Sequence, residues 1–282
     1  MQNILACIDA SNYATPVCDL AAWASRKLDL PVELLHVVQR KDAVAERHDL
    51  SGAIGLGVKS SLLEELTRLD EAEAKLQVER GRVLLATSAE RLAAAGAAGV
   101  RPLHRHGGIV ETIIEREAEA RVIVIGKRGA SHAFAQDHIG SKVERVVRAS
   151  SKPILVASRA GEPPRAAVLA YDGSPAAFRA LERCVHSPLF RDLPVHVVVA
   201  GADDARHRKL LDTALATLDG RDVTTTLKPD RPDAVIADVV AATPGAILIM
   251  GAYGHSPLRT LIVGSTTTVM IRTVHVPVLL MR

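Results

Sequence analysis

A glycine-rich segment near the end of the chain has the residue types and the spacing best suited to binding an anion. Gly251 and Gly254 are followed by nine residues and then by Gly264, Ser265 and Thr266. Glycine lets backbone N–H groups approach a ligand closely. A helix is predicted to start near Ser265, and the free N–H groups and dipole of a helix N-terminus attract negative charge. The segment therefore predicts a phosphate-binding loop to which the two hydroxyls add hydrogen bonds.

A carboxylate follows an apolar run at two places, and each place begins one copy of a repeating unit. Asp9 and Asp172 both precede a serine by two residues, and they are 163 residues apart. The prolines that start the next apolar runs, Pro31 and Pro194, have the same separation. A constant offset of this kind indicates a tandem repeat.

The glycine loop is repeated in altered form. Gly126 and Gly129 are followed by ten residues rather than nine before Gly140 and Ser141. This loop is also more basic than its counterpart, since it contains Lys127, Arg128, His132 and His138. It can still bind an anion, or it has lost its ligand and kept a structural or regulatory role.

The first copy contains 38 residues that the second copy lacks. The offset between equivalent positions falls from 163 residues to 125 at the glycine loops, so the extra residues follow Val38. Residues 51–57 predict a flexible loop, and a Leu/Glu/Ala pattern from about Ser60 to Ala95 predicts a long helix. No function follows from this insertion.

Apolar runs alternate with helical patterns along both copies. Each copy is predicted to contain five strands separated by four helices and to close with a strand led by proline, Pro153–Ala157 or Pro277–Met281. This alternation predicts an α/β fold with doubly wound parallel sheets. Ligands of such sheets bind beyond the carboxyl ends of the strands, where both aspartates and both loops fall. We predict domains at residues 1–158 and 159–282.

The composition narrows the class of protein. A net charge of +3 does not favour nucleic acid, and no apolar run approaches the length that spans a bilayer. Three cysteines without a CxxC motif, and no signal peptide, fit a cytoplasmic protein. Walker-type, Gly-x-Ser-x-Gly and His-Glu-x-x-His motifs are absent. We therefore predict no catalytic residues, and slow ATP hydrolysis at most.

The pattern Gly-x-x-Gly, nine residues, then Gly-Ser resembles the ATP-binding loop of the universal stress protein family. The resemblance covers essentially the whole chain, including the aspartate after the first strand and the closing strand led by proline. It implies the sheet order 3-2-1-4-5 of the adenine nucleotide alpha hydrolase-like fold. It also implies two fused domains whose closing strands pair as an internal pseudo-dimer, with a homodimer of the whole chain as a further option.

The resemblance further implies ATP as the ligand, with or without Mg²⁺, and assigns residues to it. Asp172 would contact the ribose or adenine, and the backbone near Val198 and Val199 would meet the adenine edge. The ribose and phosphates would contact Gly251, Gly254, Gly264, Ser265 and Thr266. The first-copy residues assigned to the same ligand roles are Asp9, Val38, Gly126, Gly129, Gly140 and Ser141.

Simpler interpretations remain open. The glycines can be turn residues, and the two aspartates can cap the helices that follow them. His104 and His106, which share one face of a strand, could bind zinc together with His132 or His138. For the whole chain, an ATP-binding stress-response and signalling module stands beside a slow ATPase or nucleotide-processing enzyme, and beside a nucleotide-free scaffold.

Overall fold

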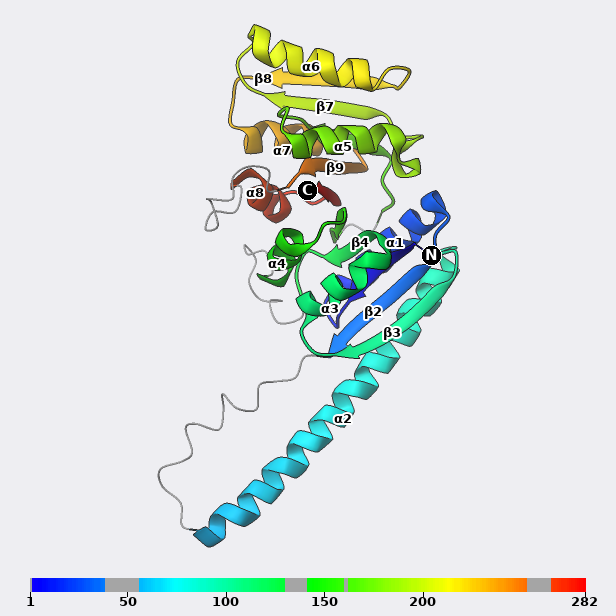
Figure 1. Cartoon of the computed structure of the whole chain (residues 1–282), viewed down its shortest axis with the longest axis vertical. Helices are drawn as coiled ribbons and strands as arrows, with labels where there is room; N and C mark the ends of the chain where they lie inside the picture. The colour runs from blue at the N-terminus through cyan, green and yellow to red at the C-terminus, as the bar shows by residue number, and fades with distance from the viewer. Residues whose placement is uncertain (1, 39–55, 130–140, 160–161, 253–264) are drawn as a thin grey trace.

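The computed structural model describes residues 2–38, 56–129, 141–159, 162–252 and 265–282. Ten strands are present in these ranges (Figure 1). The first-copy strands are β1 (Asn3–Ile8), β2 (Val32–Val38), β3 (Val100–His106), β4 (Ala120–Gly126) and β5 (Ile154–Ala157). The second-copy strands are β6 (Ala166–Ala170), β7 (Val195–Ala200), β8 (Val223–Lys228), β9 (Ala246–Gly251) and β10 (Val278–Met281).

Helices separate the strands in both copies. Those of the first copy are α1 (Ala14–Leu28), α2 (Leu56–Ala94), α3 (Ile109–Arg116) and α4 (Ser141–Ala149). Those of the second copy are α5 (Pro175–His186), α6 (Ala205–Thr217), α7 (Pro232–Ala242) and α8 (Ser265–Thr273). Short 3-10 turns, η2 (Glu117–Glu119) and η4 (Pro188–Phe190), complete the described elements.

All ten strands join one sheet, in the order β3-β2-β1-β4-β5-β10-β9-β6-β7-β8. Each half has the predicted 3-2-1-4-5 order, with parallel pairing inside the half. The two closing strands, β5 and β10, pair antiparallel, with Leu155 opposite Leu279. The fold prediction is therefore confirmed, and the predicted domain boundary falls in the connection between β5 and β6.

Alternate residues of each strand feed two apolar layers, because successive side chains of a strand point to opposite faces. From β1, one layer receives Ile4, Ala6 and Ile8, and this layer also contains residues of α1, α2, α5 and α6. The other layer receives Leu5 and Cys7, and it also contains residues of α3, α4, α7 and α8. Each layer runs through both copies without a break. Val, Ile, Leu and Ala supply most of both layers, as the aromatic content of 2% requires.

Side chains also cross between the copies. Trp23 on α1 lies 6.5 Å from Phe190 of η4, measured between ring centroids, and both rings are buried. The buried Lys127 Nζ donates a hydrogen bond of 2.7 Å to the carbonyl of Val274. Burial, and next the neighbouring charge of Arg128, lower the pKa of Lys127 to about 8. The copies are therefore joined by side chains as well as by strand pairing.

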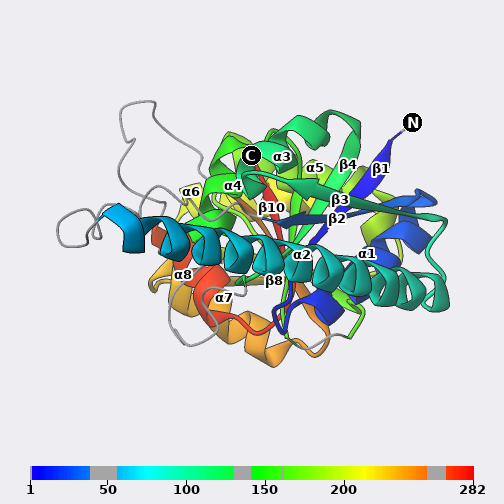
Figure 2. The same cartoon turned by 90° about the horizontal axis from the view of Figure 1, so that it is seen from below.

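The extra residues of the first copy include α2, the longest described helix. Its described part starts at Leu56, so Leu56 and Gly57 of the loop predicted for residues 51–57 are helical. The rest of that predicted loop lies outside the described residues. The C-terminal part of α2 packs on α1, β2 and β3, and its N-terminal part projects from the molecule (Figures 1 and 2). Among the described helices, α2 included, none is long and apolar enough to cross a membrane.

Candidate functional site

The turn between β1 and α1 is built around Asp9. Its Oδ1 accepts a hydrogen bond of 3.1 Å from the Ser11 N–H. The Ser11 hydroxyl accepts from the Tyr13 N–H at 3.2 Å and donates to the carbonyl of Arg128 at 3.4 Å. The aspartate therefore organises the turn, and the serine connects that turn to the glycine loop after β4.

The second copy repeats this turn. Asp172 Oδ1 accepts from the Ser174 N–H at 2.9 Å, and the Ser174 hydroxyl caps α5 by accepting from the Ala177 N–H at 3.2 Å. The residues at the N-cap positions of α1 and α5 are Tyr13 and Ser174. The alternative that the aspartates serve as helix caps is therefore wrong for both copies.

The glycines that end the fourth strands have a packing role in both copies. A Cβ on Gly126 would lie 2.6 Å from the Cβ of Tyr13, and one on Gly251 would lie 2.8 Å from the backbone N of Ala177. Such contacts are far too short, so the first helix of each copy requires glycine at this position. Close packing thus accounts for these two glycines without a ligand, which differs from the turn role considered for them from the sequence.

Gly129 has a different neighbour. A Cβ at this position would lie 2.8 Å from Asp9 Oδ2. The absence of a side chain therefore lets the backbone of the first glycine loop lie against the carboxylate of the β1–α1 turn. This contact unites the two features, aspartate and glycine loop, that the sequence placed at the same edge of the sheet.

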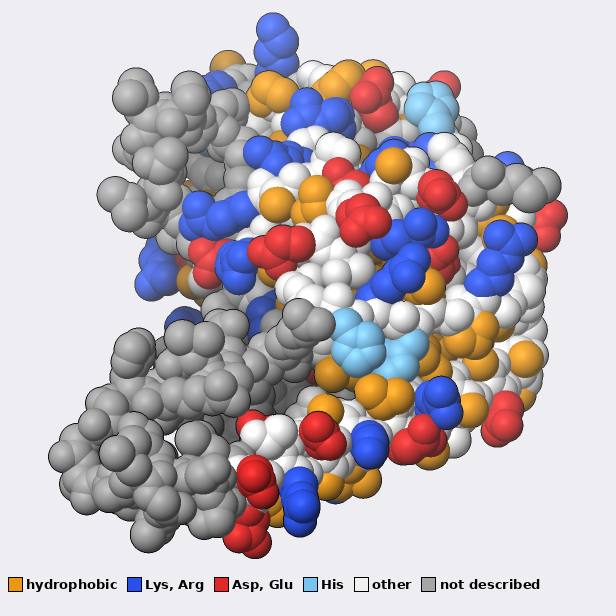
Figure 3. All heavy atoms as spheres, turned by 60° about the horizontal axis from the view of Figure 1, so that its bottom comes forward, with side chains coloured by type: hydrophobic (Ala, Val, Ile, Leu, Met, Phe, Trp, Pro, Cys, Tyr) orange, Lys and Arg blue, Asp and Glu red, His pale blue; other side chains and the backbone are white. Residues whose placement is uncertain are grey.

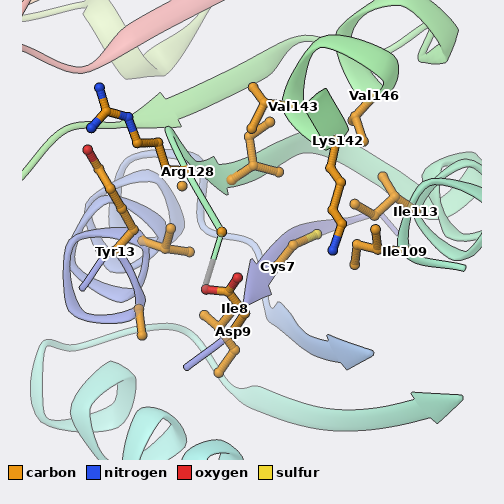
Figure 4. Close-up of a pocket in the computed structure, with 15 residues that line it drawn as sticks. Cys7, Ile8, Asp9, Tyr13, Ile109, Ile113, Arg128, Lys142, Val143 and Val146 are labelled. Carbon is orange, nitrogen blue, oxygen red and sulfur yellow. The ribbon is translucent and has the colours of Figure 1, made fainter. Parts of the chain in front are cut away.

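A cleft opens where these two features meet. Its walls come from the ends of β1 and β4 and from α1, α3 and α4 (Figure 4). The lining is mostly apolar, and the apolar lining residues are Cys7, Ile8, Ala14, Val17, Ile109, Ile113, Ile125, Val143 and Val146. A surface of this kind accommodates a flat, weakly polar group such as a purine.

Charged groups border the apolar lining. Asp9, Arg128 and Lys142 line the same cleft, with Lys142 directed toward Ile109 and Cys7, and Arg128 toward Tyr13 (Figure 4). The first turn of α4 provides backbone N–H groups that have no partner within the helix. Two cations and a helix N-terminus beside an apolar wall suit a ligand with one apolar end and one anionic end.

The cleft is also lined by a cysteine. Cys7 is the cysteine that lines it, and burial, followed by the charge of Glu33, raises the pKa of this thiol far above its usual value. A thiol held protonated is a poor nucleophile. Cys7 is therefore not activated for covalent catalysis.

The cleft includes three of the predicted first-copy residues, Asp9, Gly126 and Gly129. Val38 ends β2 without lining it, Ser141 opens α4, and Gly140 lies outside the described residues. The sequence interpretation missed Ile109, Ile113 and the α4 valines as lining residues. Their spacing of three and four residues marked apolar helix faces, but only the fold shows that part of each face meets the cleft.

In the second copy the predicted residues are described only in part. Asp172 is exposed, Val198 and Val199 are buried in β7, and the Val198 carbonyl accepts from the Tyr171 N–H at 2.9 Å. Thr266 is half-buried in the first turn of α8, which Ser265 opens. Gly254 and Gly264 lie outside the described residues, so the assigned nucleotide contacts stay predictions.

Three histidines stack in a row on β2 and β3, beneath α2. The ring centroids of His36 and His104 are 5.3 Å apart, and those of His104 and His106 are 5.6 Å apart. Within the described part of the chain, no three His, Cys, Asp or Glu side chains are placed to hold a metal ion. His132 and His138 lie outside that part. The row therefore provides no zinc site of its own.

Comparison with known proteins shows which family the chain belongs to. Residues 1–158 and 199–282 match the model of the universal stress protein family. The chain is 34% identical over 287 residues to the Universal stress protein Slr1230 of Synechocystis, and the match covers all of both proteins. The chain belongs to the universal stress protein family, with the family fold present twice.

Solved structures show the same tandem fold. The chain resembles a universal stress protein from Archaeoglobus fulgidus with a TM-score of 0.73 and 21% identity, over 99% of this chain and 98% of the other. It resembles a putative universal stress protein from Pseudomonas aeruginosa with a TM-score of 0.59 and 16% identity, over 100% of this chain and 93% of the other. At these identities the likeness concerns the fold.

Proposed function

We propose that this protein is an ATP-binding stress-response module of the cytoplasm, with one adenine nucleotide site in each copy and the tighter site in the second. The cleft beside Asp9 is the observation that carries the proposal. It combines an apolar wall, two cationic side chains and a helix N-terminus at the carboxyl ends of β1 and β4, where the strand order of the first copy reverses. Ligands of open α/β sheets bind at such switch points.

Each part of the cleft has a role in this proposal. The adenine would lie against Ile109, Ile113 and Val143, and the phosphates would lie near Arg128 and the first turn of α4. Asp9 would accept hydrogen bonds from the ribose or from the adenine amino group. The second copy would use Asp172 and the loop from Gly251 to Thr266 in the same way. Its loop has the nine-residue spacing of the family pattern, which supports a higher affinity for the nucleotide.

Calorimetric titration of the full chain with ATP and Mg²⁺ tests the proposal. A matched pair of variants, Gly140→Val and Gly264→Val, alters the same loop position in each copy. We expect two binding events in the wild type, with the tighter event lost in Gly264→Val and the weaker one lost in Gly140→Val. Thermal unfolding of each variant serves as the control for folding.

Two results would count against the proposal. Absence of binding heat in the wild type would support the nucleotide-free scaffold, and loss of the tighter event in Gly140→Val would reverse the order of the sites. Phosphate release measured on the same samples addresses the enzyme alternative. Turnover that disappears in Gly264→Val would belong to the second-copy site, whereas turnover that persists in the Gly140→Val/Gly264→Val double variant would come from a contaminant.

A further inference from the structure

Helix α2 carries two separate apolar surfaces. Leu85 and Leu92 are buried against the body of the first copy. On the other side of the helix, Leu69 is 62% exposed, Leu76 48% and Val83 62%. These three residues follow one another at intervals of seven, and Leu66, at 39% exposure, lies beside them. We call these four residues the outer stripe.

The two surfaces lie on opposite sides of the helix axis. With 3.6 residues per turn, Leu69 and Val83 are rotated only about 20° from Leu76, whereas Leu85 and Leu92 are rotated by about 160–180°. The stripe therefore faces away from the sheet along about 20 Å of the helix. In the space-filling view, exposed hydrophobic side chains lie among acidic and basic ones on the face toward which α2 projects (Figure 3). A seven-residue apolar repeat is the pattern by which one helix packs along another.

A two-fold rotation about Leu76 brings acidic residues beside the outer stripe of one molecule opposite basic residues of a second molecule. Glu73 precedes Leu76 by three residues and Arg80 follows it by four, and both lie about 40–60° to the same side of the stripe. If two α2 helices from two molecules run antiparallel with Leu76 opposite Leu76, Glu73 of one molecule lies within about 1.5 Å, measured along the helix axis, of Arg80 of the other molecule. The same rotation places Leu69 of one molecule opposite Val83 of the other molecule.

The other side of the stripe shows the same relation. Lys75 precedes Leu76 by one residue and Glu79 follows it by three, so the rotation brings these opposite charges to within about 3 Å in height. Within one chain Glu79 pairs with Arg82 at 2.9 Å, but both side chains are exposed, and exposed pairs of this kind exchange at little cost. Each of the four charged residues that flank Leu76, Glu73, Lys75, Glu79 and Arg80, therefore lies opposite a residue of unlike charge in this arrangement.

We propose that the outer stripe is a self-association surface, and that two molecules pair through antiparallel α2 helices centred on Leu76. An isologous contact of this kind closes into a dimer and does not propagate. The dimer leaves the cleft beside Asp9 and the β5–β10 junction untouched, so it is independent of nucleotide binding. It also gives the 38-residue insertion a role that the second copy does not need.

Sedimentation velocity of the full chain over a concentration series tests the pairing. We expect a dimer in the wild type and an increase of at least about tenfold in the dissociation constant of Leu76→Lys. Leu215→Lys is the matched control, because Leu215 is a leucine of similar exposure, 41%, on α6. A wild type that is monomeric throughout would overturn the proposal and would mean that another segment or another protein covers the stripe. A dimer that survives Leu76→Lys would overturn it as well.

A charge exchange tests the register. Glu73→Arg and Arg80→Glu should each weaken the dimer, and the double variant should restore it, because each variant alone places like charges together. In a mixture of Leu69→Cys and Val83→Cys proteins, oxidation should join residue 69 of one molecule to residue 83 of the other. Crosslinks between two copies of Leu69→Cys would instead show a parallel pair and overturn the arrangement.

Discussion

Gly81 and His104 show how a single residue can set the position of an element. Gly81 lies in the middle of α2, where glycine is unfavourable, yet a Cβ there would lie 2.6 Å from His104 Nε2 and 2.8 Å from His36 Cδ2. The missing side chain lets α2 lie directly on the histidine row. His104 Nε2 is consequently buried without a hydrogen-bond partner among the described residues.

This environment predicts a pH-dependent stability. Burial, then the charges of His36, His106 and Arg82, lower the pKa of His104 below its usual 6.5. Below about pH 6.5 the unfolded chain therefore binds a proton that the native protein resists, so stability is full above this pH and falls as pH decreases. Urea unfolding at pH 7.5 and 5.5 should show a smaller loss of stability for His104→Gln than for the wild type. Equal losses would show that His104 does not titrate in this way.

The residues of the site also mark the limit of sequence interpretation. Asp9, Gly126 and Gly129 could be identified because they repeat positions of the second copy, whose loop spacing resembles that of the family, and the structure brings all three to one cleft. Gly126 and Gly251, however, are glycines because the first helix of each copy passes within van der Waals distance, a reason that no spacing shows. The apolar wall from α3 and α4 was hidden as well, because its residues look like ordinary core positions until the helices are placed.

At the scale of elements, the two copies share one continuous core. Apolar layers continue across the β5–β10 junction, and Phe190 of η4 packs against Trp23 of α1 with no exposed surface of its own. The pairing of the closing strands was predicted from the resemblance to the universal stress protein family, which assigns it to Pro153–Ala157 and Pro277–Met281, and β5 and β10 do pair. The sequence could not predict the Trp23–Phe190 contact, since neither residue has an equivalent in the other copy that would mark it.

This contact predicts a large effect for a small change. Phe190→Ala should lower the free energy of unfolding by about 3–5 kcal/mol, because it leaves a cavity between the copies. Phe178→Ala is the control: Phe178 is 40% exposed on α5, and its removal should cost less than about 1 kcal/mol. Denaturant titration measures both. A cost for Phe190→Ala no larger than that of the control would show that the Trp23–Phe190 contact does not hold the copies together.

For the whole molecule, the duplicated fold places one candidate nucleotide site in each half of a shared sheet. The glycine loops of the two halves differ. The first-copy loop is one residue longer and more basic, and the second-copy loop has nine residues between Gly254 and Gly264. Lys127 connects the first loop to the carbonyl of Val274, just beyond the end of α8, and α8 begins at the second glycine loop. A ligand in either candidate site would therefore lie close to an element that contacts the other half.

Photolabelling of the full chain with an azidoadenine analogue of ATP, followed by peptide mass spectrometry, tests the central claim most directly. The adenine is expected to lie against the apolar wall of the first copy, so label should appear on peptides that contain Ile109–Arg116 or Val143, and on their second-copy equivalents around α7 and α8. Excess ATP should prevent this labelling. Label confined to other surfaces, or label that ATP does not displace, would contradict a nucleotide site at the carboxyl ends of these strands.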